Sequence, residues 1–589
     1  MQNAETVLGV LRERGRRGLP CNELYRQLFN PHLYLLAYGK LYSNHGAMTP
    51  GVDGETVDGM SLAKIKRIIE ALRHERYRFK PVRRVYIPKK NGRRRPLGLP
   101  SWTDKLVGEV IRLLLEAYYE PQFSDLSHGF RPQKGCHTAL RKVAVAWSGT
   151  TWFIESDIAQ CFDRLDHSVL MGILGEKIRD NRFLRLLRNM LQAGYLEDWK
   201  WNATYSGAPQ GGVVSPILSN IYLDRLDTFV ETVLIPQYTR GELRRSNPAY
   251  KEVKNALNRA RRRGDRIAAR QLRKQWRSLP SRDPQDPGYR RLRYIRYADD
   301  QLLGFIGPKA EAEQIKQQVA TFLHDDLKLE MSQPKTLVTH GRTSAARFLG
   351  YEITVQHANH RRAVNGTVGL RVPKDVIKAK SAPYCKLGKP ETQTRMINEN
   401  DHAIVETFGS KYRGLVNYYL LAGDVWRLSR VRWVMETSLL KTLACKYDSS
   451  VSKMAARYKT TIDTPHGPRK CLQAIIERTG KKPLTATFGG IPLKRQRNAI
   501  LDDRKPPPDT IIRHTELIKR LQTGRCEMCQ HTGEVEVHHV SKLAHLGKPG
   551  TPQPPWAALM AKRRRKTLVV CAACHDAIHG RQPPATLTV

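Results

Sequence analysis

Hydrophobic and polar positions along the chain follow a helical period in some segments and a strand period in others. Residues 60–120 read as helices around a hairpin, because two runs, 84–88 and 96–100, flank Asn91-Gly92. Asn-Gly favours a tight turn, since both residues tolerate positive φ. Residues 401–458 read as helical, and one face carries Phe408, Tyr412, Leu415, Tyr418, Tyr419 and Leu420. With 589 residues, the chain is long enough for several domains.

Two of the strand patterns lead to acidic residues. Residues 291–297 and 301–305 read as strands joined by Ala298-Asp299-Asp300, and residues 152–158 read as a third strand with Asp157 near its end. Adjacent carboxylates on a hairpin tip raise each other's pKa unless a cation neutralises them. An acidic turn alone is common, but three carboxylates on neighbouring strands suit the two Mg²⁺ ions, about 3.5–4 Å apart, of nucleotidyl transfer.

The charge of the chain indicates a polyanionic partner. One hundred Lys and Arg residues face 55 Asp and Glu residues, which gives a formal net charge of +45. Residues 237–290 contribute strongly, and we expect a basic helical insertion that lies along a phosphate backbone; the alternative is a solvated charged hairpin. No apolar run is long enough for a membrane span, and residues 1–18 are charged. We therefore expect a cytoplasmic protein, associated with the nucleoid when on DNA, and no membrane partner.

Four of the ten cysteines form two CxxC pairs near the C-terminus, and the other six are scattered singly and are expected in the core. The pairs are Cys526/Cys529 and Cys571/Cys574. Four thiolates at this spacing predict a tetrahedral Zn²⁺ site that helps a small polar domain to fold. Disulfides are the competing interpretation, which a cytosolic location disfavours. His538-His539 lies between the pairs, and His575 and His579 are spaced to share a helix face, which suits metal ligation.

Taken together, the motifs resemble those of the reverse transcriptases encoded by mobile group II introns, over nearly the whole chain. The matching blocks, in order, are residues 44–54, residues 87–98, residues 128–132, residues 157–163, residues 209–216, residues 297–300, Lys335, residues 348–351 and residues 414–419. The resemblance implies that Asp157, Asp299 and Asp300 hold two Mg²⁺ ions. It also implies nucleotide-binding roles for Lys89, Arg95, Phe162, Gln210 and Lys335.

These implied roles are specific. Lys89 and Arg95 would neutralise the incoming triphosphate, and Phe162 would collide with a ribose 2′-hydroxyl and so favour deoxynucleotides. Gln210 would line the nucleotide pocket. Phe162 could instead be a plain core aromatic and Lys335 a solvated lysine.

The C-terminal Cys/His segment resembles an HNH endonuclease. The resemblance implies that His539 is the general base that activates water and that His538, His575 and His579 face one divalent ion. Many HNH nucleases have an asparagine before the second knuckle, whereas this chain has Lys566-Thr567, so the role of that position is unassigned. A zinc finger that only grips DNA is the alternative.

We therefore expect a multidomain α/β (α+β) protein. It would combine a right-hand polymerase, with fingers, palm and a helical thumb, and a small zinc-bound ββα-metal nuclease. The expected divisions are 1–365 for fingers and palm with the insertion at about 237–290, 366–460 for the thumb or maturase domain, 461–515 for a basic DNA-binding linker module, and 516–589 for the nuclease.

The family resemblance also implies partners and a biological process. The protein would bind its intron RNA, assist splicing, nick target DNA and extend the nicked strand with deoxynucleoside triphosphates, which is retrohoming. Two rivals are a splicing factor whose enzymatic sites are vestigial and a reverse transcriptase that serves defence or mutagenesis. The intact carboxylates and His539 argue against the first, and the pairing of this thumb with a C-terminal HNH-like segment argues against the second.

Overall fold

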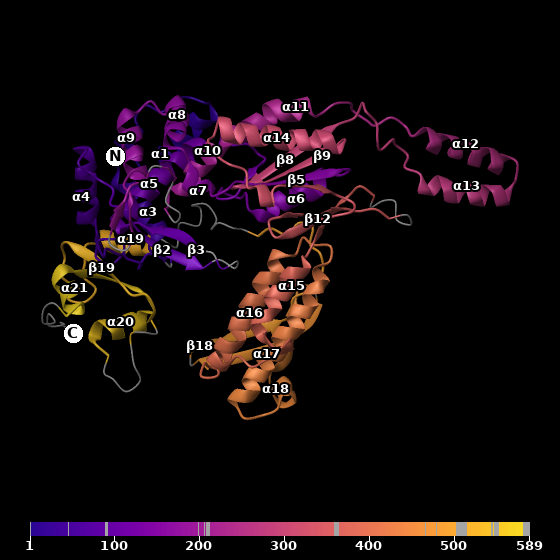
Figure 1. Cartoon of the computed structure of the whole chain (residues 1–589). Helices are drawn as coiled ribbons and strands as arrows, with labels where there is room; N and C mark the ends of the chain where they lie inside the picture. Colours follow the sequence, from indigo (N-terminus) through magenta and orange to yellow (C-terminus); the bar gives the residue numbers. More distant parts are fainter. Residues whose placement is uncertain are drawn as a thin grey trace.

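The computed structural model confirms that the chain mixes helices and strands (Figure 1). The structure describes residues 2–44, 46–88, 92, 94–197, 200–204, 206–207, 212–358, 365–465, 467–478, 480–501, 515–543, 546 and 553–580. Lys89 and Gln210 lie outside the described residues, as does Asn91 of the expected turn. Within the described ranges, no helix is both long and apolar enough to cross a membrane.

A five-stranded sheet occupies the middle of the polymerase part, in the order β10-β5-β9-β8-β4. Its strands are β4 (Ser127–His128), β5 (Trp152–Asp157), β8 (Arg291–Tyr297), β9 (Asp300–Ile306) and β10 (Leu337–His340). Helix α14 (Lys309–Asp325) contacts the sheet at β5, and α6 (Cys136–Ala146) contacts it at β8 (Figure 1). Because helices cover it, β9 is buried at every residue after Asp300. The three strands expected from the sequence are confirmed.

The N-terminal part adds a helical layer and a second sheet. Its helices are α1 (Ala4–Arg16), α2 (Leu24–Gln27), α3 (Pro31–Leu41), α4 (Leu62–Arg73), α5 (Trp102–Tyr119), α7 (Cys161–Arg164), α8 (His167–Lys177), α9 (Asn181–Leu191), α10 (Ser215–Phe229) and α11 (Ile235–Gln237). The second sheet has the order β3-β2-β6-β7, with β2 (Val82–Pro88), β3 (Arg94–Leu99), β6 (Tyr195–Glu197) and β7 (Lys200–Asn202). Strands β2 and β3 pair antiparallel, which confirms the expected hairpin.

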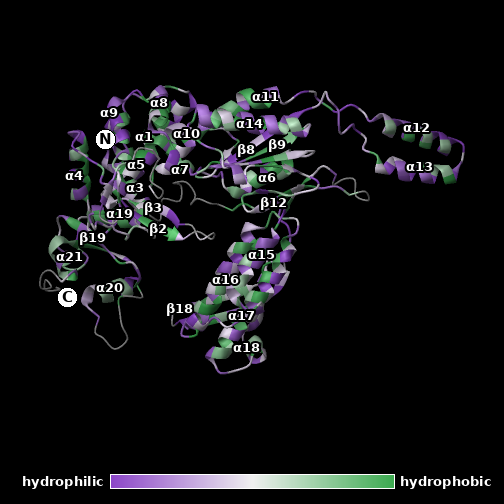
Figure 2. Cartoon of the chain, viewed as in Figure 1, coloured by the Kyte–Doolittle hydropathy of each residue, from purple (hydrophilic) through white to green (hydrophobic). Residues whose placement is uncertain are grey.

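Two helices of the basic insertion extend away from the sheet (Figure 1). They are α12 (Pro248–Arg262) and α13 (Arg266–Ser278), which pack against each other. Hydrophilic positions run along both (Figure 2), and α13 buries no residue. The helical insertion is therefore confirmed, while its place along a phosphate backbone stays a prediction.

The segment after the central sheet begins with three strands that contact the sheet and α6, and it continues into a lobe below them (Figure 1). Strands β11 (Ala346–Phe348), β12 (Tyr351–Val355) and β13 (Val368–Arg371) precede α15 (Lys374–Ser381), β14 (Cys385–Lys386), β15 (Lys389–Pro390), α16 (Asp401–Tyr418), α17 (Ser429–Lys446) and α18 (Val451–Tyr458). Of the expected apolar face, Phe408, Tyr412 and Tyr419 are buried, whereas Leu415, Tyr418 and Leu420 are only half-buried. The helical pattern over 401–458 is thus three helices with turns between them.

The structure differs from the expected linker at 461–515. Residues 459–489 form an antiparallel sheet of β16 (Lys459–Thr464), β17 (Gly467–Arg478) and β18 (Lys481–Gly489). This sheet packs on α16, and Leu472, Ala474 and Phe488 join the core of that lobe. The expected division at 460/461 therefore falls inside β16. Alternating burial along β16 is the strand signal that the charged composition concealed.

The C-terminal part contains α19 (Thr515–Gln522), β19 (Val535–His539), α20 (Pro555–Arg563), β20 (Thr567–Cys571) and α21 (Ala572–Ile578). Strands β19 and β20 pair antiparallel, and β1 (Met60–Ser61), from the other end of the chain, adds to the outer edge of β19. The C-terminal part therefore docks on the N-terminal helices (Figure 1). Of the six single cysteines expected in the core, Cys445 is exposed and Cys385 half-buried, so the expectation is wrong for these two.

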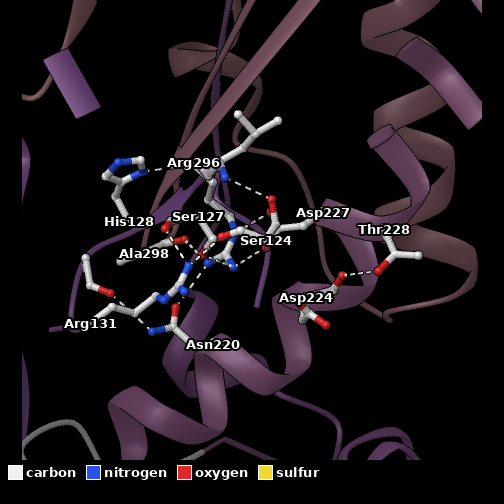
Figure 3. A network of polar contacts seen from close by, with 12 residues as sticks. Ser124, Ser127, His128, Arg131, Asn220, Asp224, Asp227, Thr228, Arg296 and Ala298 are labelled. Carbon is white, nitrogen blue, oxygen red and sulfur yellow. Dashed lines mark hydrogen bonds and ion pairs between the residues drawn. The ribbon is translucent and has the colours of Figure 1, made fainter. Parts of the chain in front are cut away.

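A buried ion pair lies beneath the turn that joins β8 and β9 (Figure 3). Arg296 and Asp227 are 0 % and 1 % exposed, and the Arg296 Nη2 atom lies 2.5 Å from Asp227 Oδ2. Arg296 Nη1 also donates to the Ala298 carbonyl at 2.9 Å and to Asn220 at 3.2 Å, and Nη2 donates to Ser127 at 2.8 Å. The network thus fixes the carbonyl just before Asp299.

A second element holds the same turn from the side. Strand β4 runs parallel to β8, and the Ala298 N–H donates to the His128 carbonyl at 2.9 Å. Gly129 has a φ of +84°, and a Cβ there would lie 2.9 Å from Ala298 N. Only glycine fits this close approach.

We predict that breaking the buried pair destabilises the central sheet strongly. Arg296→Met leaves the Asp227 carboxylate uncompensated in the interior, which should cost about 3–5 kcal/mol. The Arg296→Met/Asp227→Leu double variant should recover part of that loss, because neither charge remains. The measurement is the opening free energy of β8 and β9 from native-state amide hydrogen exchange.

The exposed pair Arg347–Asp375, at 2.8 Å, is the matched control. Arg347→Met should cost no more than about 1 kcal/mol, because solvent screens that pair. Equal losses at the buried and exposed pairs would contradict the importance assigned to Arg296.

Candidate functional site

Three carboxylates meet at one end of the central sheet. Asp157 at the end of β5 is the register partner of Asp300 at the start of β9, and Asp299 lies in the turn before it. Ala298, the first residue of that turn, has a φ of +53°. Lys335 donates to Asp157 Oδ2 at 2.8 Å. The structure therefore brings together the three aspartates and Lys335, as the sequence predicted.

The pKa values show how crowded these carboxylates are. Burial, followed by the charges of Asp299 and Asp157, raises the pKa of Asp300 to about 7. Burial and Asp157 also raise the pKa of Asp299, against the lowering effect of Arg95 and Lys335. Negative charge is disfavoured here unless a cation compensates it. The donor set, which is all carboxylate oxygen, fits hard divalent cations such as Mg²⁺.

Two of the other expected nucleotide-binding residues flank the carboxylates. Arg95 is exposed on β3 and near enough to Asp299 to affect its pKa. Phe162 lies in α7, is half-buried, and packs edge-on against Phe130 with ring centroids 6.3 Å apart. Phe162 is thus partly exposed, and its contact with a nucleotide stays a prediction.

The four C-terminal thiols converge as expected. One sulfur atom from each of Cys526, Cys529, Cys571 and Cys574 lies within 4.8 Å of the others. The Cys529 and Cys571 sulfur atoms are 3.7 Å apart, far longer than the roughly 2.05 Å of a disulfide, and all ten cysteines of the chain are free. Four converging thiols with this spacing fit a tetrahedral, closed zinc site.

A second cluster contains the imidazoles of His538, His575 and His579, together with one carboxylate that the sequence did not indicate. That carboxylate is Asp58, which lies just before β1, and one ligand atom from each residue lies within 4.8 Å of the others. The ring nitrogens of His538 and Nε2 of His575 are buried, and His538 Nδ1 and His575 Nε2 face the Asp58 oxygens at 3.3 and 3.4 Å. Buried imidazole nitrogens that converge with a carboxylate on one point fit a divalent metal ion.

Glu536 supports this cluster from the neighbouring strand position. Its carboxylate lies 3.0 Å from His575 Nδ1, which is the arrangement that orients a metal-binding imidazole. Burial alone lowers the pKa of His575, but Asp58 and Glu536 outweigh burial and raise this pKa to about 9. A metal that binds there must therefore displace a proton.

His539 points away from the cluster, toward the N-terminal helices. It is 5 % exposed, and its Nε2 atom lies 2.9 Å from the Tyr38 hydroxyl. Its backbone N–H donates to Asp58 Oδ1 at 2.7 Å. Burial lowers the pKa of His539 to about 3, so the imidazole is neutral and has the protonation state of a base.

The position with no assigned role, Lys566-Thr567, belongs to a network that the sequence analysis also missed. Arg520 donates to the Thr567 hydroxyl at 2.9 Å and to Glu527 at 3.0 Å, and Glu527 accepts the Val569 N–H at 2.8 Å. The Val540 N–H donates to the Lys566 carbonyl, so the residue after His539 is held by a backbone contact. No local motif signals Arg520, because its partners lie up to 47 residues away.

Comparison with protein-family models gives three matches. Residues 87–240 match a reverse transcriptase (RNA-dependent DNA polymerase) family, residues 370–477 a type II intron maturase family, and residues 526–575 an AI2M/AI1M-like HNH endonuclease family. The first range contains Asp157, and the second contains helices α16, α17 and α18. The third contains the four cysteines together with His538, His539 and His575.

Curated proteins match over most of the chain. The group II intron-encoded protein LtrA of Lactococcus lactis subsp. cremoris is 37% identical over 94% of this chain and 94% of its own length. A putative COX1/OXI3 intron 1 protein of Saccharomyces cerevisiae is 31% identical over 95% of this chain and 69% of its own length. The chain therefore belongs to the group II intron-encoded proteins and carries reverse transcriptase, maturase and HNH endonuclease domains.

Proposed function

We propose that this protein carries out retrohoming with two separate metal centres. It binds its intron RNA, assists splicing, nicks one strand of target DNA with the C-terminal centre and extends the free 3′ end at the central sheet. The observation that carries the proposal is that one chain gathers both an all-carboxylate cluster and a histidine cluster, each suited to a different reaction on nucleic acid.

In the polymerase centre, Asp157, Asp299 and Asp300 would hold two Mg²⁺ ions, which when bound would supply the positive charge that the primer 3′-hydroxyl and the triphosphate need. Lys335 holds Asp157 in place before substrate arrives, as its 2.8 Å contact indicates. Arg95 and Lys89 neutralise the triphosphate, and Gln210 lines the nucleotide pocket. Phe162, which is half-buried, would clash with a ribose 2′-hydroxyl and so favour deoxynucleotides.

In the nuclease centre, the four cysteines hold a structural Zn²⁺ that joins β20 and α21 to the residue 526–529 knuckle. His538, His575 and His579 hold a divalent ion that polarises the scissile phosphate when bound. His539, kept neutral by burial, takes the proton from the attacking water.

The nucleic acid contacts rest on basic surfaces. Exposed arginines line the insertion, among them Arg259, Arg261, Arg262, Arg270 and Arg273. They suit a phosphate backbone, which is recognised by charge and shape rather than by base sequence. The chain is then divided as fingers and palm over 1–365, thumb from 366 through the sheet that ends at residue 489, and nuclease over 516–589. The expected site of action is the cytoplasm or an organelle matrix, on the nucleoid during DNA insertion.

Asp299→Asn should abolish primer extension, because it removes an anionic ligand from the metal pair. RNA affinity should stay within about twofold, since binding depends on many basic contacts remote from the turn. The two measurements are cDNA synthesis on a primed RNA template and filter binding of the intron RNA. Substantial cDNA from this variant would remove Asp299 from the metal site.

The raised pKa of Asp300 makes the metal-free protein sensitive to pH. The folded protein keeps a proton up to about pH 7 that the unfolded chain loses near its ordinary value of 3.8. Stability should therefore be greatest below that ordinary value and fall as the pH rises toward 7. Asp300→Asn should remove this fall, so its advantage in melting temperature over the wild type should grow between pH 4.5 and 8 in EDTA.

Asp375→Asn provides a control of opposite sign, because its hydrogen bond with Arg347 lowers the pKa of Asp375. That variant should lose stability at neutral pH and match the wild type in acid. Added Mg²⁺ at pH 8 should cancel the advantage of Asp300→Asn, since the ion compensates the three charges. If the difference in melting temperature between Asp300→Asn and the wild type does not change with pH, the raised pKa of Asp300 would be contradicted.

Two C-terminal variants should fail in different ways. His539→Ala removes the base but no metal ligand, so it should keep the zinc content of the wild type and a protease-resistant domain, yet lose strand nicking. Cys529→Ser breaks the closed site, so it should lose zinc and expose residues 516–589 to protease. Zinc determination, limited proteolysis and a nicking assay distinguish the two, and primer extension by both variants is the control.

Normal nicking by His539→Ala would return the domain to the alternative of a zinc finger that only grips DNA. Zinc retention by Cys529→Ser would likewise remove this cysteine from the closed site.

A further inference from the structure

The two ends of the chain share one structural unit. Strand β1 pairs with β19, with Met60 opposite Val537 and Ser61 opposite Glu536, and α19 contacts α3. Figure 1 shows the C-terminal elements beside the N-terminal helices and away from the α15–α18 lobe. The contact places Asp58 against the histidine cluster, 480 positions away in sequence from His538.

Asp58 reaches all three imidazoles of the cluster. Its Oδ2 atom lies 2.8 Å from His579 Nε2 and 3.4 Å from His575 Nε2, and its Oδ1 atom lies 3.3 Å from His538 Nδ1. The Asp58 side chain is only 17 % exposed. A carboxylate at this position is the fourth donor of a compact set whose other three members are the nuclease histidines.

The number of protein ligands decides what such a site can do. A catalytic centre of this type has three protein ligands and keeps a further position for water or substrate, whereas four protein ligands saturate a tetrahedral ion. Asp58 takes the position that a scissile phosphate would need. The N-terminal region also blocks His539, because the Tyr38 hydroxyl contacts its Nε2 atom and the ring is buried.

We propose that Asp58 is the fourth ligand of the ion held by His538, His575 and His579, and that this site fastens the nuclease to the N-terminal region in a closed, non-cutting state. The proposal rests on the histidine site assigned under the proposed function. Cutting then requires the C-terminal part to leave the β1 edge, which frees the fourth position and His539 together.

The test uses the full chain, its cysteine site filled with zinc, titrated with Co²⁺. Cobalt in a four-coordinate site absorbs visible light strongly, whereas cobalt on carboxylates and water absorbs weakly, so the polymerase centre does not interfere. Wild-type protein should show the four-coordinate spectrum. Asp58→Asn keeps an oxygen acceptor for the His539 N–H but removes the anionic ligand. This variant should bind Co²⁺ at least tenfold more weakly, because loss of a residue that only supports a ligand already lowers metal affinity roughly 10–100-fold.

Asp53→Asn is the matched control. Asp53 lies in the same loop, has a similar side-chain exposure of 20 %, and pairs with Lys80 rather than with the histidines. This variant should bind Co²⁺ with the wild-type spectrum and affinity. An Asp58→Asn protein that does the same would overturn the proposal, and the contacts of Asp58 would then be hydrogen bonds to imidazoles without an ion.

Amide hydrogen exchange gives a second readout that needs no variant. Metal should slow exchange of the His539 N–H, which donates to Asp58, and of the Gly59 N–H, which donates to the Val537 carbonyl at 3.1 Å. Exchange at these two amides that does not respond to metal in the wild type would overturn the proposal, even if Asp58→Asn proves unstable.

Nicking separates this proposal from the nuclease assignment itself. Asp58→Asn should nick target DNA severalfold faster than the wild type, and Asp58→Asn/His539→Ala should not nick at all. An Asp58→Asn rate at or below the wild-type rate would overturn the closed state. Nicking by the double variant would instead refute the role of His539, and leave the cobalt result to decide the role of Asp58.

Discussion

The buried Arg296–Asp227 pair is the interaction on which the polymerase centre depends. Removing two charges from water is costly, and the cost is offset only when every hydrogen-bonding group finds a partner. Arg296 meets this condition by binding Asp227, Asn220, Ser127 and the Ala298 carbonyl at once. The Arg296 side chain therefore connects helix α10, strand β4 and the β8–β9 turn, and these contacts fix the position of Asp299.

The same constraint explains why the turn tolerates its unfavourable features. Ala298 has a positive φ, which costs a non-glycine residue roughly 1–2 kcal/mol, and two aspartates follow it. Such strain persists only where the surroundings over-determine the conformation. The hydrogen bond from Arg296 to the Ala298 carbonyl and the pairing of residues 127–128 with β8 restrain the turn in this conformation. The three carboxylates can therefore stay close together before any cation binds.

Much of the fold and of both centres could be predicted from the sequence, because their signals are local. Short stretches of sequence are enough to predict the hairpin at Asn91-Gly92, the strands around Asp299-Asp300 and the two CxxC pairs. Features that depend on distant contacts were missed. The basic composition of strands β16–β18 favours a linker, and only their packing on α16 shows which positions are buried. Asp58 has no neighbour in sequence that hints at His538.

A chain with two chemistries on DNA has to order them, and the structure supplies a physical means. In the proposed scheme both centres hold metal, but the polymerase centre offers only carboxylate oxygens from nearby positions of one sheet, whereas the histidines meet a carboxylate from the N-terminal part of the chain. Whatever moves the N-terminal helices relative to the C-terminal part therefore changes the ligand number at one centre and leaves the other intact. RNA that binds the basic surface of the polymerase could supply that movement only through differential affinity for the docked and released arrangements. Because β1 contributes just two residues to the shared sheet, the docked arrangement depends mainly on apolar packing, in which Leu517, Leu521 and Val537 are buried in the core of the N-terminal helices, and the ion bridged by Asp58 would add to that packing.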